Sequence, residues 1–254
     1  MPRCNRLAGR LSSLTMFPYD SVLAAAVAAV PQSVPDVVAI LETIGSTCAD
    51  TDGLKWFNWL YLQVTEAVQA RINTAGFSDP NWIAILDVRF AGFYFAAIRA
   101  ALTGGSAPGC WQAVFNVRSQ APVTRLQFAL AGMNAHINHD LPQAIVAVCQ
   151  ATNITPQHGT PHYNDYTALN ATLDAIINTA KLELNVRLAG DGLPDATRLE
   201  NLVAAWGIAA AREVAWKNAE VLWHLREVPL VSDAFLESVD ATTAVASKAL
   251  LVPV

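Results

Sequence analysis

The sequence has few charged residues. Asp, Glu, Lys and Arg together make up only 15% of it, against about 25% in an average soluble protein, while 53% of the residues are hydrophobic. The 16 Lys and Arg residues form no cluster, and the formal net charge is −5 at pH 7. Surfaces that bind nucleic acid need concentrated positive charge. We therefore expect a large buried core and no nucleic-acid partner.

Long apolar runs are also missing. The longest, such as residues 22–30 and 202–211, are about ten residues long, whereas a helix needs about 20 apolar residues to cross a bilayer. Residues 1–18 are basic but hold no continuous apolar segment, so we interpret them as an N-terminal tail and not as a signal peptide. We expect a soluble protein without a membrane partner.

The four cysteines form no closely spaced pair. Cys4, Cys48, Cys110 and Cys149 are far apart in the sequence, and a zinc site or a redox motif would need a spacing such as CxxC. We interpret them as buried or free thiols in a reducing compartment, which predicts a cytoplasmic protein.

The apolar residues that are present recur at the helical period of 3.6, and no alternating run typical of a strand occurs between turn residues. This pattern predicts an all-α fold, with residues 19–254 forming a single multi-helix domain around a buried central helix pair, residues 54–75 and 80–102. The helices we expect span residues 20–30, 34–44, 54–75, 80–102, 110–117, 122–140, 142–152, 164–188, 195–227 and 231–251.

The most promising group of polar side chains lies in residues 131–145, which contain His136, His139 and Asp140. A helix advances about 100° per residue, so His136 and Asp140 lie about 40° apart on one face, at the edge of the core. Pro142 should kink the helix or restart it beside this pair. His136 and Asp140 thus form either a functional centre or a structural pair in which Asp140 caps the next helix. His139 points another way and is either a further site residue or a surface histidine.

The opposite face of the same helix carries Gln127, Asn134 and Asn138. Polar residues on one side of an amphipathic helix usually face water. We therefore expect this stripe to be solvated.

Asp87 lies on an otherwise apolar helical face with neighbours such as Ile83, Phe90 and Tyr94. An unpaired buried charge costs several kcal/mol. We expect Asp87 to be buried and paired, either in an ion pair with a neighbouring helix or as a metal ligand or acid–base group.

Two further polar groups remain open in their roles. Glu213, Lys217, Glu220, His224 and Glu227 form a stripe that is either a solvated, salt-bridged face or a polar groove walled by tryptophans; Glu220 and His224 are its site candidates. The segment of residues 154–166 contains His158 and His162 and is either a loop that closes over a site or a plain surface loop.

Three segments carry a resemblance to a known family: WFNWLYLQVTEAV at residues 56–68, LDVRFAGFYFAAI at 86–98 and GMNAHINHDL at 132–141. Over residues 50–225 the chain resembles the bacterial helical proteins grouped as domain of unknown function 5995, which implies an all-helical fold. The pattern His136-x-x-x-Asp140-x-Pro142 is also similar to the ligand helix of zinc-dependent phospholipase C and the S1/P1 nucleases. The N-terminal Trp ligand and the further His after the Pro of those proteins are not matched here.

These observations lead to three hypotheses about function. In the first, His136 and Asp140 hold a divalent metal such as zinc, with Asp87, His224 or Glu220 as further ligands, and the protein is a hydrolase or lyase. In the second, His136 oriented by Asp140 is a metal-free acid–base group that isomerises or cyclises a small apolar metabolite. In the third, the protein only binds such a molecule. All three predict a small organic partner, and a homo-oligomer stays open.

Overall fold

The computed structural model describes residues 17–188 and 207–253, and every regular element in these two ranges is helical. The all-α prediction is therefore confirmed. The tail up to residue 16, Cys4 and the start of the helix expected at 195–227 lie outside the described residues. The elements are α1 (Asp20–Ala26), α2 (Val34–Thr47), α3 (Leu54–Asn73), α4 (Pro80–Leu102), α5 (Gly109–Phe115), α6 (Arg125–Ala135), the π-helix η1 (His136–Asp140), α7 (Leu141–Thr152), α8 (Pro161–Ala168), α9 (Asn170–Leu188), α11 (Ile208–Leu225) and α12 (Pro229–Leu250).

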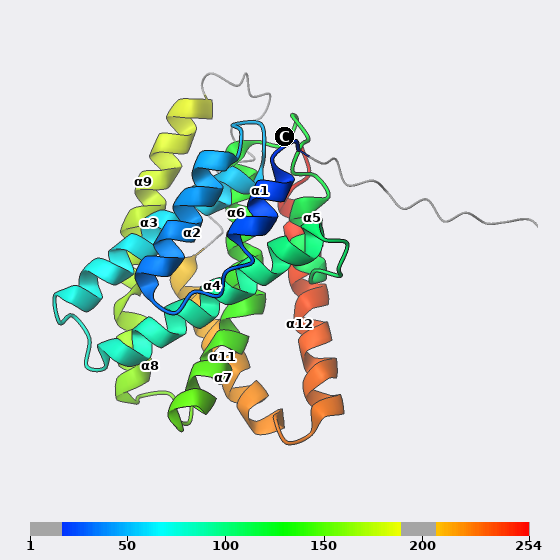
Figure 1. Ribbon diagram of the computed structural model, residues 1–254. Helices are drawn as coiled ribbons and strands as arrows, with labels where there is room; N and C mark the ends of the chain where they lie inside the picture. The colour runs from blue at the N-terminus through cyan, green and yellow to red at the C-terminus, as the bar shows by residue number, and fades with distance from the viewer. Residues whose placement is uncertain (1–16, 189–206, 254) are drawn as a thin grey trace, which may run out of the picture.

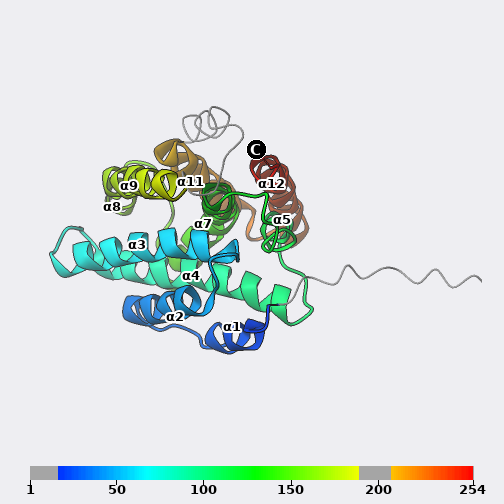
Figure 2. The same ribbon diagram turned by 90° about the horizontal axis from the view of Figure 1, so that it is seen from above.

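The helices are arranged in layers around α3 and α4 (Figures 1 and 2). Seen from above, α3 and α4 run across the molecule, with α1 and α2 on one side and the ends of α6, α7, α9, α11 and α12 on the other. Helix α3 contacts α2 and α6, and α4 contacts α7. The pair α3–α4 is thus covered on both sides, which confirms the predicted buried central pair.

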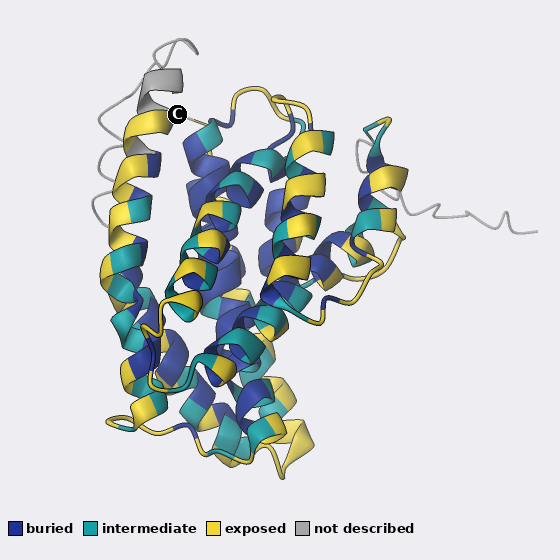
Figure 3. Cartoon of the chain, turned by 60° about the vertical axis from the view of Figure 1, so that its left-hand side comes forward, coloured by how far each residue is buried: buried dark blue, intermediate teal, exposed yellow. Residues whose placement is uncertain are grey.

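Burial follows the helical periodicity (Figure 3). Buried residues lie where neighbouring helices face one another, and exposed residues lie on the outer faces. The largest fully buried side chains include the aromatic residues Trp82, Trp111, Trp216, Tyr94 and Tyr166. No helix within the described ranges is both long and apolar enough to cross a membrane.

Local sequence explains where several helices begin. Ser33 and Thr124 each accept a hydrogen bond from the backbone N–H three residues on, which makes them N-caps of α2 and α6. Asp79 does the same for α4, and Pro80 occupies the first helical position, where its missing N–H costs nothing. The predicted helix at 164–188 begins earlier and divides at Leu169 into α8 and α9.

Two of the three residues in the polar stripe that we expected to be solvated are not, and for these two the prediction is wrong; the third, Asn138 in η1, is partly exposed. Gln127 and Asn134 are buried. Gln127 Nε2 donates to the carbonyls of Leu250 (2.7 Å) and Val252 (2.6 Å), and Asn134 Nδ2 donates to the Thr243 carbonyl at 3.0 Å. The amides bind backbone acceptors in and just after α12, which packs across this face.

Beside Pro142, where the sequence predicts a kink or a restart of the helix, the structure has a π turn. The chain stays helical from α6 through η1 into α7, and the Leu141 N–H donates to the carbonyl of His136, five residues back. Pro142 lacks the N–H that an α-helix would use at its position. A single π turn of this kind is rare and occurs often at functional sites.

Candidate functional site

The predicted pair of His136 and Asp140 forms in the structure. His136 Nδ1 lies 2.9 Å from Asp140 Oδ2, and the two side chains are only 2% and 1% exposed. Trp111 Nε1 donates to the same Oδ2 at 2.9 Å, while His139 Nδ1 lies 2.7 Å from Oδ1. Asp140 makes no side-chain cap of α7. His139 is buried and not a surface histidine, because η1 turns it inward beside Asp140.

Protonation follows from these contacts. Burial would raise the pKa of Asp140, but the hydrogen bonds from His136 and His139 outweigh it and hold that pKa below its ordinary value. Burial lowers the pKa of His136. Burial also tends to lower the pKa of His139, but the hydrogen bond to Asp140 and the charge of Asp140 outweigh this effect and raise that pKa. As the pH falls, His139 is therefore protonated before His136. The neutral His136 ring carries its proton on Nδ1, where it can donate to Asp140, and its lone pair on Nε2.

Aromatic rings from α3, α4 and α5 enclose the His136 imidazole. Phe90 stacks on it with ring centroids 3.5 Å apart and an interplanar angle of 7°, and the edge of Tyr61 approaches to a centroid distance of 4.6 Å. Phe57, Tyr94 and Trp111 complete the wall. His136 Nε2 is buried and has no hydrogen-bond partner among the described residues. Such an orphaned atom is rare in a folded protein.

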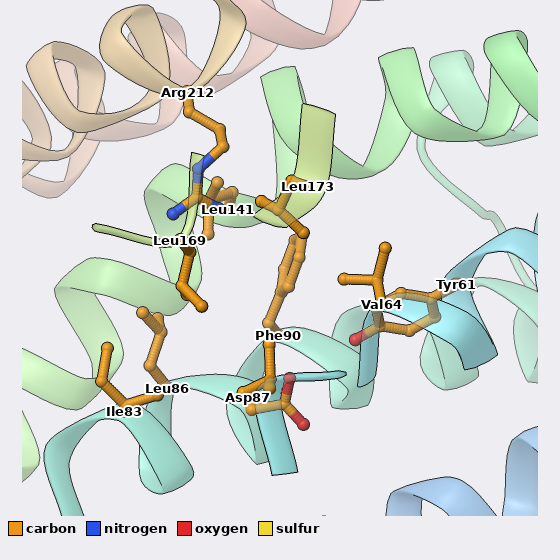
Figure 4. A pocket seen from close by; sticks show the side chains of 11 residues that line it. Tyr61, Val64, Ile83, Leu86, Asp87, Phe90, Leu141, Leu169, Leu173 and Arg212 are labelled. Carbon is orange, nitrogen blue, oxygen red and sulfur yellow. The ribbon is translucent and has the colours of Figure 1, made fainter. Parts of the chain in front are cut away.

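Two small cavities adjoin this centre. One, of about 50 Å³, is lined by His136; the other, of about 40 Å³, is lined by Asp87 and is drawn in Figure 4. Both are otherwise mostly apolar. They share the lining residues Tyr61, Val64, Phe90, Leu173 and Arg212. The two cavities are therefore neighbours, and the Phe90 side chain borders both of them.

Asp87 is buried, as expected, but its predicted ion pair is absent from the described part of the chain. Its Oδ2 has no hydrogen-bond partner there, and neither has the buried hydroxyl of Tyr61. Burial raises the pKa of Asp87 to about 7. The expected ion pair is missing because Asp87 faces a cavity and not a neighbouring helix. A carboxyl group in this state exchanges its proton near neutral pH.

Glu220 and His224 do not join this centre. His224 is exposed near the end of α11, and neither residue is among those that line the two cavities described above. Glu220 Oε1 binds the backbone N–H and Nδ1 of His158 at 2.9 and 2.7 Å. His158 Nε2 lies 2.8 Å from Glu213 Oε1. The stripe of α11 therefore anchors the segment before α8, which matches the salt-bridged interpretation better than the groove.

His162 lies apart from both cavities. Its Nε2 is 3.2 Å from Asp79 Oδ2, at the start of α4. Together with His158 it holds the segment around α8 against its neighbours and not over His136.

Sequence reasoning missed Tyr61, Phe90 and Arg212 as lining residues. Tyr61 and Phe90 lie among many apolar residues and carry no distinguishing signal. Arg212 did carry one, because the residues three, four and seven positions after it, Ala215, Trp216 and Ala219, are all apolar and place it on the buried face of its helix. That buried face is the one that packs towards the cavities.

The metal prediction finds no support in this geometry. Within the described ranges no three His, Cys, Asp or Glu side chains are grouped so that they could hold a metal ion. Both oxygens of Asp140 already accept hydrogen bonds from ring nitrogens. His136 and Asp140 are arranged as a hydrogen-bonded dyad and not as two ligands of one ion.

Comparison with known proteins gives a family and no function. No curated protein and no solved structure matches the chain. One family model, described as a family of unknown function (DUF5995), matches residues 34–253. The match contains all three segments that carried the resemblance and extends it at both ends. The chain therefore belongs to the DUF5995 family.

Proposed function

We propose that this protein is an acid–base enzyme in which His136, oriented by Asp140, moves protons on a small, mostly apolar molecule held in the adjoining cavities. The observation that carries the proposal is the His136 Nε2 atom. Its ring is fixed through Nδ1 by Asp140 at 2.9 Å, yet Nε2 has no protein partner in the described structure. A base needs such a free lone pair beside a substrate cavity.

Each neighbour of His136 has a role in this chemistry. Asp140 selects the tautomer with the proton on Nδ1 and stabilises the imidazolium that forms when Nε2 accepts a proton. The aromatic wall excludes water, which strengthens charge interactions. Asp87, with a pKa of about 7, returns a proton at another position of the substrate. Removal at one atom and return at another is an isomerisation. His136 then gives its proton to solvent and Asp87 takes one up, so the net reaction consumes no second reactant.

The proposal is tested with cyclopentanone, a small apolar ketone with exchangeable protons next to its carbonyl. In D₂O, NMR follows the replacement of these protons by deuterium. The wild-type protein should accelerate the exchange, and His136→Gln should lose about 10²- to 10⁴-fold of that acceleration, the usual contribution of an acid–base group. Ligand-observed NMR should show that the variant still binds the ketone. His224→Gln, at an exposed position outside the site, serves as the matched control and should exchange like the wild type.

A second measurement uses the wild-type protein, so it does not require that a variant fold. The ¹⁵N chemical shifts of the His136 ring in the wild-type protein report which nitrogen carries the proton. We expect a protonated Nδ1 and a bare Nε2 at pH 7. Binding of the ketone without accelerated exchange would instead favour the non-catalytic binding hypothesis, and a proton on Nε2 would contradict the assigned role of His136.

A further inference from the structure

Arg212 is a buried cation that lines both cavities. It enters from α11, and Figure 4 shows its guanidinium among Leu141, Leu169 and Leu173, with Asp87 entering from α4. Only 6% of Arg212 is exposed, so its charge is removed from water. Arginine is almost never buried in this way without a charged partner.

Neutral groups hold the guanidinium in place. Nε donates to Asn170 Oδ1 at 2.7 Å and Nη2 donates to the Tyr166 carbonyl at 2.7 Å. The ring of Tyr166 stacks on the guanidinium, with 3.9 Å between its centroid and Cζ. These contacts fix the orientation of the group but cancel none of its charge.

No carboxylate compensates Arg212 among the described residues. The ion pairs found there do not include it, and Asp87, which lines one of the same cavities, does not pair with it. The remaining nitrogen, Nη1, has no hydrogen-bond partner in that part of the structure. Burial without a counter-charge lowers the pKa of Arg212. A cation in such surroundings attracts an anion strongly.

We infer that the ligand of this site is a small apolar carboxylate whose anionic head pairs with Arg212. The inference deepens the proposed function by naming the class of substrate. A guanidinium presents parallel N–H groups that match a carboxylate. Cavities of about 40 and 50 Å³ suit this compact head better than a phosphate. Leu169, Leu173 and Phe90 then line the apolar body of the ligand.

The experiment compares pentanoate with pentanamide, two probes of nearly the same shape that differ in charge. Ligand-observed NMR measures the dissociation constant of each at pH 7.5. The wild-type protein should bind pentanoate at least about tenfold more tightly, because a tenfold ratio is only about 1.4 kcal/mol. Arg212→Gln should lose this preference. A purely structural Arg212 would change the melting temperature but not the ratio of the two constants.

Lys217→Gln is the matched control. It removes one positive charge from the same helix at a side chain that is 62% exposed, and it should keep the preference for pentanoate. If Arg212→Gln does not fold, the side-chain N–H signals of Arg212 in the wild type decide the matter. They should shift on addition of pentanoate and stay in place with pentanamide.

Failure of this inference and failure of the proposed function give different results. His136→Gln should lose proton exchange on cyclopentanone and keep the preference for pentanoate. Equal binding of the two probes by the wild type, or no binding of pentanoate at all, overturns the carboxylate inference and leaves the exchange result unaffected. Unchanged Arg212 signals in the presence of bound pentanoate overturn it as well.

Discussion

At the scale of single residues, Asp140 is the group that orients His136 and His139 and influences their protonation. Its two oxygens accept from Trp111, His136 and His139, so one carboxylate holds two imidazoles and an indole. Burial keeps His136 neutral, while contact with Asp140 raises the pKa of His139. The pKa values of two histidines three positions apart are thus shifted in opposite directions, because aromatic rings enclose His136 and its burial outweighs its contact with Asp140.

Asp87 should make the stability of the protein depend on pH. Its pKa of about 7 in the folded state exceeds the value of about 3.9 expected in the unfolded chain. The folded state then binds the proton more tightly, so its contribution to stability is full below about pH 4 and is lost as the pH rises to about 7. Asp87→Asn removes this loss. The free energy of unfolding of Asp87→Asn, relative to that of the wild type, should increase by roughly 2–3 kcal/mol between pH 5 and pH 8.

Urea denaturation of both proteins at several pH values measures this difference. A constant difference between wild type and variant from pH 5 to pH 8 would show that Asp87 ionises as freely as it does in water.

At the scale of elements, close approach between α6 and α3 positions the aromatic wall. Gly132 lies one turn before His136, and a Cβ atom there would be 2.4 Å from Cγ of Phe57. Real Cβ atoms do not come so close to a ring carbon. Only glycine therefore lets Phe57 pack against α6 and reach the imidazole, with a centroid distance of 5.6 Å.

Gly132→Ala should destabilise the protein even though alanine favours helices. Overpacking a core costs about 1–3 kcal/mol, which exceeds the gain in helix propensity of about 1 kcal/mol or less. Near-UV circular dichroism should also change, because Phe57 and its neighbouring rings must move. Thermal or urea unfolding gives the free energy of unfolding.

Gly92→Ala in α4 is the control for this substitution. No atom lies within 4 Å of a Cβ built at Gly92, so the same change there should stabilise the protein by about 0.5–1 kcal/mol. Equal effects at the two glycines would mean that Phe57 yields easily and that the wall is loosely packed.

At the scale of the whole molecule, a buried ion network ties distant parts of the chain together. Arg118, between α5 and α6, donates to Asp20 at the start of α1 (2.8 Å) and to Asp52 just before α3 (2.6 and 3.0 Å). Its carbonyl accepts from the N–H of Gly53 at 2.7 Å. Ion pairs through Arg118, as well as apolar contacts, therefore hold α1 against the central pair α3–α4.

Arg118→Ala should destabilise the protein by about 3–5 kcal/mol, because it leaves two buried carboxylates without their cation. Arg99→Ala at an exposed position of α4 should change the free energy of unfolding by no more than about 0.5 kcal/mol. Urea denaturation compares the two variants. A loss below about 1 kcal/mol in Arg118→Ala would show that water reaches Asp20 and Asp52.

The sequence alone predicted the helices and the dyad. Helix starts at Ser33 and Asp79 depend on contacts within three residues, and His136 and Asp140 are four residues apart on one helix. Both kinds of contact follow from backbone geometry that every helix shares. The family resemblance, too, was visible in short segments.

Only the tertiary structure decided what surrounds the dyad. Asp87 and Arg212 are 125 positions apart in the sequence, and they line one cavity because α4 and α11 pack around the same space. The sequence placed Gln127 on a solvated face, but α12 packs over it. The sequence also made Glu220 a candidate site residue, but in the structure it binds His158. A helical wheel gives the direction of a side chain but not the helix that it meets. That partner depends on how all the helices pack together, which no local pattern contains.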